Sequence, residues 1–232
     1  MNEPPTRTEA RGPLAAVNAV LRRPEASLRR LGEPGGGAFA FRALVAALGG
    51  CFLYGLVSGI FQGGPQLLVS ALKAPVVVGG SLLLCLPSLY VFSALADGDI
   101  SWRRVGAATV GFATLLAVIL AGLVPIVWLF SVSSRSLTFV VLLHFFLWAL
   151  ALLLAFRILS LAFPTGLARS VVFLWLGVFF VVSLQVATVL RPVLWTAEGG
   201  PVIEEGKMFF LQHFGEVIDL DREIQAAEKA GG

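Results

Sequence analysis

The sequence predicts an all-α fold, a polytopic membrane helix bundle with five transmembrane helices. Of the 232 residues, 57% are hydrophobic and only 13% are charged. A soluble domain of this length would expose much of that apolar surface to water. The chain also holds five apolar runs, each near or above the roughly 20 residues needed to cross ~30 Å of hydrocarbon. Because backbone groups in lipid must be satisfied within their own segment, these runs are predicted to be helices.

The apolar runs divide the chain into three parts. Residues 1–40 form an N-terminal segment with amphipathic helices, residues 41–191 the five-span bundle, and residues 192–232 an amphipathic tail. The third run is long enough to tilt or to extend into the membrane interface. Pro75 is expected in the first turn of the second span, where its missing N–H costs nothing. The runs are Ala43–Phe61, Ala74–Ala96, Val105–Phe130, Leu137–Phe156 and Val171–Leu190.

Positive charge is distributed unequally between the two sides of the predicted bundle. Only Lys73 and Arg135 lie in the two short loops of one side, whereas eleven arginines lie on the side of the N-terminus. Because Lys and Arg accumulate on the cytoplasmic side, the N-terminus is predicted to be cytoplasmic and the C-terminus outside. The excess of Arg over Lys is typical of a GC-rich bacterial genome, and the expected location is the bacterial inner (cytoplasmic) membrane. The eleven are Arg7, Arg11, Arg22, Arg23, Arg29, Arg30, Arg42, Arg103, Arg104, Arg157 and Arg169.

Two groups of cations are candidates for contact with lipid headgroups. In the N-terminal segment, Leu14, Val17 and Leu21 share one helical face, which predicts short amphipathic helices on the inner leaflet. A docking site for a cytosolic partner is the alternative. On the opposite side, Lys73 either reaches a lipid phosphate or pairs with a carboxylate of the tail, which holds eight acidic and four basic residues. The predicted headgroup contacts are Arg22, Arg23, Arg29, Arg30 and Lys73.

Small residues recur every four positions in the first span. Cys51, Gly55, Gly59 and Gly63 line one helix face and let another backbone approach closely. The partner is either another span of the chain or a second protein. Cys51 and Cys85 lie in separate apolar runs and match no metal-ligand spacing, so we expect buried thiols and no metal site.

A second set of residues could form a kink or a path through the bundle. Pro87 frees the carbonyl of Leu83 and should kink the second span, with Ser81, Ser88 or a water satisfying that carbonyl. This kink is either a static bend or a moving gate. His144 is either a proton relay or ligand or a group bonded to a neighbouring carbonyl. The set comprises Cys85, Pro87, Ser88, Pro125, His144 and Gln185.

Signs of catalysis are missing from the sequence. It contains no H-E-x-x-H, G-x-S-x-G or Walker motif, so we expect no enzyme, no catalytic residue and no cofactor. No Asp or Glu lies well inside a span, which counts against a cation-coupled transporter. The expected partners are membrane lipids and another membrane protein or a second copy of the chain, without nucleic acid.

Four short stretches resemble a broad family of uncharacterised bacterial integral membrane proteins. They are Tyr54–Gly59, Ser70–Pro75, Cys85–Ser88 and Leu190–Pro192. In the family pattern Phe-Ile-Gly follows Leu-Arg-Pro, whereas this chain has Val193–Trp195. The resemblance implies a similar fold and brings no activity with it.

The overall plan is also similar to the Yip family, which has a cytosolic N-terminal segment, five spans and a non-cytosolic C-terminus. Leu21–Pro24, with the sequence Leu-Arg-Arg-Pro, resembles bacterial Yip-domain proteins. This resemblance implies a part in membrane traffic or organisation, by analogy of architecture. We therefore expect a non-enzymatic membrane scaffold or accessory subunit, the alternative being a small-molecule or lipid transporter.

Overall fold

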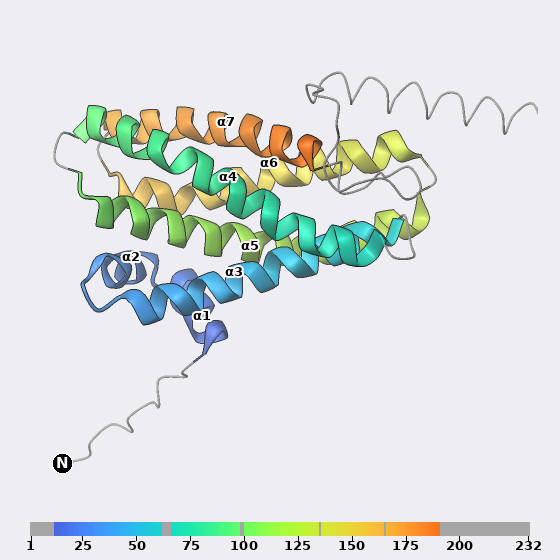
Figure 1. Cartoon of the computed structure of the whole chain (residues 1–232), viewed down its shortest axis with the longest axis horizontal. Coiled ribbons are helices and arrows are strands. Elements are labelled where there is room, and N and C mark those ends of the chain that lie inside the picture. The colour runs from blue at the N-terminus through green and yellow to red at the C-terminus, as the bar shows by residue number, and fades with distance from the viewer. Residues whose placement is uncertain (1–11, 62–65, 98–99, 135, 165, 191–232) are drawn as a thin grey trace, which may run out of the picture.

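The computed structural model describes residues 12–61, 66–97, 100–134, 136–164 and 166–190 (Figure 1). These residues form seven α-helices and one short 3-10 turn, and no strand occurs among them. The all-α prediction is confirmed. The elements are α1 (Pro13–Arg22), α2 (Pro24–Gly32), α3 (Gly37–Ser58), η1 (Gly59–Phe61), α4 (Gln66–Asp97), α5 (Trp102–Ser133), α6 (Leu137–Ala162) and α7 (Gly166–Val189).

Helices α3 to α7 are each long and apolar enough to cross a membrane, which confirms the five predicted spans. Most of the helices extend beyond the apolar runs. The added turns carry charged residues such as Arg42, Arg157 and Arg169, whose long side chains can reach the interface while the helix continues. Helix α4 starts eight residues before Ala74, so Pro75 lies inside this helix and its predicted place in a first turn is wrong.

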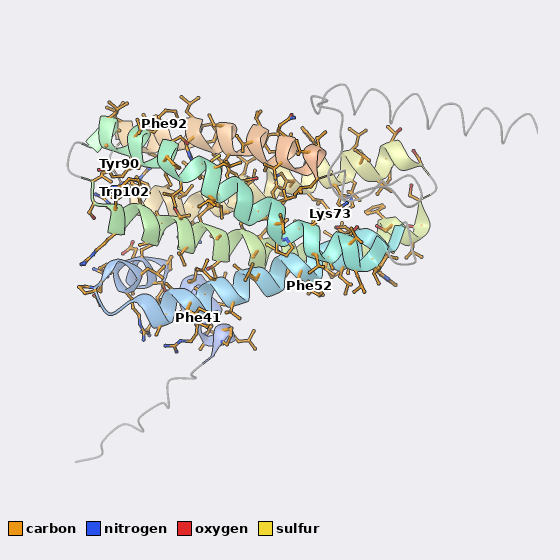
Figure 2. All side chains as sticks on the ribbon, in the orientation of Figure 1. Phe41, Phe52, Lys73, Tyr90, Phe92 and Trp102 are labelled. Carbon is orange, nitrogen blue, oxygen red and sulfur yellow. The ribbon has the colours of Figure 1, made fainter. Side chains whose placement is uncertain are left out.

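The five long helices run alternately up and down, and they pack mainly in four pairs. Helix α3 packs against α5 and α4, α4 against α7, and α5 against α6 (Figure 1). Large buried side chains such as Phe112, Trp175 and Phe179 fill the interior. The outward faces carry exposed apolar residues, among them Phe41 and Phe52 of α3 (Figure 2). An apolar perimeter around a packed interior is what a bundle surrounded by lipid requires.

Helix α3 approaches its neighbours through glycine. A Cβ added at Gly55 would lie 2.5 Å from the Ser70 carbonyl oxygen and 2.7 Å from the Ala74 Cβ of α4. A Cβ at Gly59 would lie 2.9 Å from the Leu67 Cα. The small-residue face of the first span therefore packs against α4 of the same chain, with Cys51 buried beside it. Gly63 lies outside the described residues.

The loop between α6 and α7 is tied to the start of α5. The Arg104 Nε donates to the Ala162 carbonyl oxygen at 2.9 Å, and the guanidinium carbon lies 5.5 Å from the centre of the Phe163 ring. A cation at the C-terminus of α6 is favoured by the dipole of that helix. On the neighbouring corner, the Tyr90 and Trp102 rings stack with centroids 3.9 Å apart (Figure 2). These contacts align the ends of α4, α5 and α6.

Replacing Gly55 with alanine should destabilise the bundle, because the new methyl group has no space against the α4 backbone. We expect the free energy of unfolding to fall by about 1–3 kcal/mol, the usual cost of overpacking, measured by SDS titration of the purified protein. Gly49→Ala is the matched control, since a Cβ there meets nothing within 4 Å. Equal unfolding midpoints for the two variants would show that α3 and α4 are not in close contact.

Candidate functional site

Helices α1 and α2 form a short pair that packs on one end of the bundle. Pro13 and Pro24 open the two helices, and proline suits a first turn because no N–H is required there. Ala16 and Val20 of α1 are 2% exposed, and α1 packs against α3 and α5. In α2, Leu28 lies against α5, since a Cβ at Gly111 would be 3.2 Å from its Cδ2. The predicted amphipathic helices are thus present as a docked pair.

The face of α1 that packs on the bundle is separate from the face with Leu14 and Leu21, which the sequence predicts to lie on the inner leaflet. Leu14 is 83% exposed and Leu21 is also exposed, while Ala16 and Val20 point inward. The short side chains of Ala16 and Val20 allow α1 to lie close to α3. The face bearing Leu14 and Leu21 stays uncovered and is available to acyl chains or to a protein.

The turn between α2 and α3 is compact and requires a glycine. A Cβ at Gly36 would lie 2.2 Å from the Arg30 carbonyl oxygen, and the Gly36 N–H donates to the Glu33 carbonyl oxygen at 3.0 Å. The Arg30 guanidinium carbon lies 4.8 Å from the centre of the Phe39 ring, a cation–π distance. These contacts hold the α1–α2 pair in place relative to α3.

The four arginines predicted to contact headgroups lie together on this pair, and all four are exposed. The bundle end on which the pair packs also carries the other five arginines among the residues that the structure describes. Helix α5 has 32 residues, or about 48 Å at 1.5 Å per residue, so it exceeds ~30 Å of hydrocarbon by several turns. Helix α2 packs beside the first turns of α5, at a depth suited to the membrane interface. The nine arginines at this end of the bundle are Arg22, Arg23, Arg29, Arg30, Arg42, Arg103, Arg104, Arg157 and Arg169.

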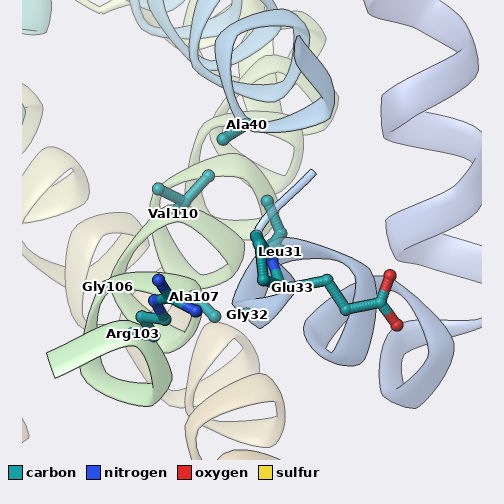
Figure 3. A pocket seen from close by; sticks show the side chains of 9 residues that line it. Leu31, Gly32, Glu33, Ala40, Arg103, Gly106, Ala107 and Val110 are labelled. Carbon is teal, nitrogen blue, oxygen red and sulfur yellow. The ribbon is translucent and has the colours of Figure 1, made fainter. Parts of the chain in front are cut away.

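An open pocket of about 300 Å³ lies between the end of α2 and the first turns of α5 (Figure 3). Arg103 and Glu33 are its charged residues, and Leu31 and Val110 are among the apolar residues in its wall. Gly106 also lines it, and a Cβ added there would meet nothing within 4 Å. The pocket therefore combines an apolar wall with one charge of each sign at its edge.

A hydrogen-bonded histidine lies inside the opposite half of the bundle. One ring nitrogen of His144, Nε2, is 3.2 Å from the Ser58 Oγ, and Nδ1 is 2.9 Å from the Val140 carbonyl oxygen. The Tyr54 ring meets the His144 ring edge-on, with centroids 5.9 Å apart. His144 thus links α6 to α3, and it bonds a carbonyl of its own helix rather than one on a neighbouring helix.

Two tryptophans join α7 to its neighbours by hydrogen bonds. The Trp148 Nε1 of α6 donates to the Ser183 Oγ at 2.9 Å. The Trp175 Nε1 of α7 donates to the Cys85 carbonyl oxygen at 3.0 Å and to the Ser88 Oγ at 3.2 Å. The Trp175 ring also stacks on Phe179 with centroids 5.5 Å apart. The side chains that make these contacts fill the space between α4 and α7.

The residues expected to line a path are only partly brought together. Cys85 is buried and Ser88 and His144 are partly buried, whereas Pro87 and Pro125 are exposed on the outer faces of α4 and α5. The two prolines therefore face the surroundings of the bundle rather than its interior. Gln185 is partly buried near the end of α7. The Ser88 hydroxyl donates to Cys85 rather than to Leu83, and the buried Ser81 hydroxyl has no partner among the described residues.

Lys73 differs from the four arginines in its surroundings. It is only 4% exposed on α4 (Figure 2), so its side chain does not extend outward as contact with a lipid headgroup would require.

The hydrogen bonds of Trp175 to α4 and of Ser58 to His144 were not expected from the sequence. A tryptophan among many aromatic residues gives no signal of its own, and a serine at the end of a span reads as a cap.

No group of three or more His, Cys, Asp or Glu side chains in the described ranges could hold a metal ion. Cys51 and Cys85 are buried free thiols. The chain matches no family model, no curated protein and no solved structure. The candidate site is therefore defined by its geometry alone: an arginine-rich α1–α2 surface with an adjoining pocket, and a hydrogen-bonded interior at the other half.

Replacing Trp175 with phenylalanine should weaken the contact between α4 and α7. The variant keeps the ring packing but leaves the Cys85 carbonyl and Ser88 without the indole donor. We expect a loss of about 1 kcal/mol in the free energy of unfolding, the scale of interhelical hydrogen bonds in membranes. SDS titration measures it, with Trp128→Phe on the exposed face of α5 as control. The same midpoint for both variants would mean that the indole N–H does not stabilise the bundle.

Proposed function

We propose that this protein is a non-enzymatic scaffold or accessory subunit of a complex in a bacterial inner membrane. The observation that carries the proposal is the α1–α2 pair, packed by Ala16, Val20 and Leu28 onto the bundle with its arginines turned outward. A rigidly held basic surface next to an open pocket suits docking more than chemistry. In this proposal the arginine-rich end faces the cytoplasm, in accordance with the positive-inside rule.

The arginine surface and the pocket have different roles in the proposal. Arg22, Arg23, Arg29 and Arg30 bind anionic headgroups, with each basic residue near the surface worth about 1 kcal/mol. The exposed Leu14 and Leu21 lie toward the acyl chains of the same leaflet. The pocket beside α2 then opens toward the cytoplasm at the level of the membrane interface, where a partner can insert an apolar side chain or short segment.

Filling the pocket tests whether a partner docks there. Gly106→Leu places an isobutyl group in the pocket, at a position where a Cβ meets nothing within 4 Å. Gly122→Leu is the matched control, because it adds the same group on the exposed face of α5, away from the pocket, where a Cβ also meets nothing within 4 Å. We expect a partner protein to co-purify stoichiometrically with the wild type in mild detergent, and Gly122→Leu should retain it. Gly106→Leu should lower its recovery about tenfold, equivalent to about 1.4 kcal/mol.

The control for this comparison is the thermal stability of both leucine variants, which should match that of the wild type. Recovery of the same partner in the same amount with Gly106→Leu would contradict a docking role for the pocket. Quantitative mass spectrometry of the eluted proteins gives the readout.

The alternative function is transport of a small molecule or lipid, favoured by His144 and its bond to Ser58 inside the bundle. Such a protein would carry flux across proteoliposomes, and His144→Ala would abolish it while Trp128→Phe would not. The packed contacts of Phe112 with Trp175 and Phe179 support the scaffold over a path in this conformation. Flux that depends on His144 would make transport the function.

A further inference from the structure

The charge that faces the pocket between α2 and α5 is positive. Figure 3 shows the Arg103 guanidinium beside Gly106 on the first turns of α5, whereas the Glu33 carboxylate extends away from it. The two charged residues of the pocket therefore do not pair with each other. The last turn of α2 adds the exposed Arg29 and Arg30 nearby. An anionic ligand is the one that this surrounding charge favours.

The charged and the apolar parts of the pocket follow one another along α5. Arg103 is next to Trp102, an exposed residue whose ring stacks on Tyr90, and these two residue types are typical of the membrane–water interface. Val110, which also lines the pocket, is seven residues after Arg103, or about 10 Å toward the middle of the helix. The pocket thus has its cation at the level of the headgroups and its apolar wall nearer the acyl chains.

This order of groups matches a phospholipid. A guanidinium donates two N–H groups to a phosphate in a planar, bidentate geometry, and basic pockets of membrane proteins on the cytoplasmic side bind anionic headgroups. The pocket of about 300 Å³ is within the usual range for ligand pockets, about 300–1,000 Å³. We infer that it holds one anionic phospholipid, with the phosphate on Arg103 and part of an acyl chain along Leu31 and Val110.

A lipid in this pocket regulates the docking of a partner. In the proposed function an apolar segment of the partner enters the same pocket, and the two occupants exclude each other. The partner must therefore displace the lipid, so its apparent affinity falls as the anionic lipid content rises. This competition rests on the proposed function, whereas the lipid site is a property of the chain by itself.

Native mass spectrometry of the purified full-length protein tests the lipid site. The protein is released from nanodiscs of phosphatidylcholine and phosphatidylglycerol, and the lipids bound to each chain are counted. Arg103→Gln should weaken the binding of one phosphatidylglycerol about tenfold, equivalent to about 1.4 kcal/mol. Arg157→Gln is the matched control, because Arg157 is an exposed arginine at the same end of the bundle and does not line the pocket.

A second pair of variants separates the pocket from the arginine surface. Gly106→Leu fills the pocket without a change of charge and should lose the same lipid, while Gly122→Leu should keep it. Loss of the lipid in Arg103→Gln but not in Gly106→Leu would place it on the surface and overturn the inference. Equal retention by Arg103→Gln and Arg157→Gln would also overturn it, as would equal binding of phosphatidylcholine and phosphatidylglycerol by the wild type.

Recovery of the co-purifying protein distinguishes this inference from the proposed function. Phosphatidylglycerol added during purification should lower that recovery, and phosphatidylcholine should not; an equal recovery with both lipids would overturn the competition. If Gly106→Leu loses the partner but binds phosphatidylglycerol as the wild type does, the lipid site is overturned and the docking role stands. If it loses the lipid but keeps the partner, the lipid site stands and the docking role is contradicted.

Discussion

Helix α3 meets two neighbours through backbone atoms, and the positions of the other helices follow from these approaches. Gly55 lies against the Ser70 carbonyl of α4, and a Cβ at Gly50 would be 2.7 Å from the Ala117 carbonyl oxygen of α5. Inside a membrane, close packing replaces the hydrophobic effect as the main attraction between helices. Helix α7 packs on α4 and bonds to it through Trp175. Helix α6 and the α1–α2 pair both pack on α5. A change in the spacing around α3 would therefore reach both ends of the bundle.

The same arrangement gives the two ends of the molecule different charged residues and different surfaces. At one end, α5 extends beyond the hydrocarbon thickness and supports α2, the exposed arginines and the pocket that contains Gly106. At the other end, Lys73 of α4 is buried. Between them, Phe112, Trp175 and Phe179 pack against one another. A filled centre with two different ends favours a protein that joins components over one that passes a substrate.

The five spans could be predicted from the sequence because hydropathy depends on composition alone. Their ends were less predictable, since Arg157 and Arg169 interrupt the apolar pattern while the helix continues through them. The spacing of Gly55 and Gly59 indicated a close approach but could not identify α4 as the partner. Periodicity also cannot tell which way an apolar helix is turned when lipid and protein interior are both apolar. For this reason Pro87 and Pro125, which the transport alternative placed along a path, lie on the outer faces of α4 and α5.

In the function proposed above, the protein acts by joining other components of the membrane. The most direct measurement is the mass of the wild-type protein extracted with its native lipids, determined by native mass spectrometry without crosslinking. For a scaffold or accessory subunit, we expect a complex of defined stoichiometry that contains a second membrane protein or a second copy of the chain. A single chain carrying one specific small molecule, released when His144 is replaced, would contradict it and make transport the function.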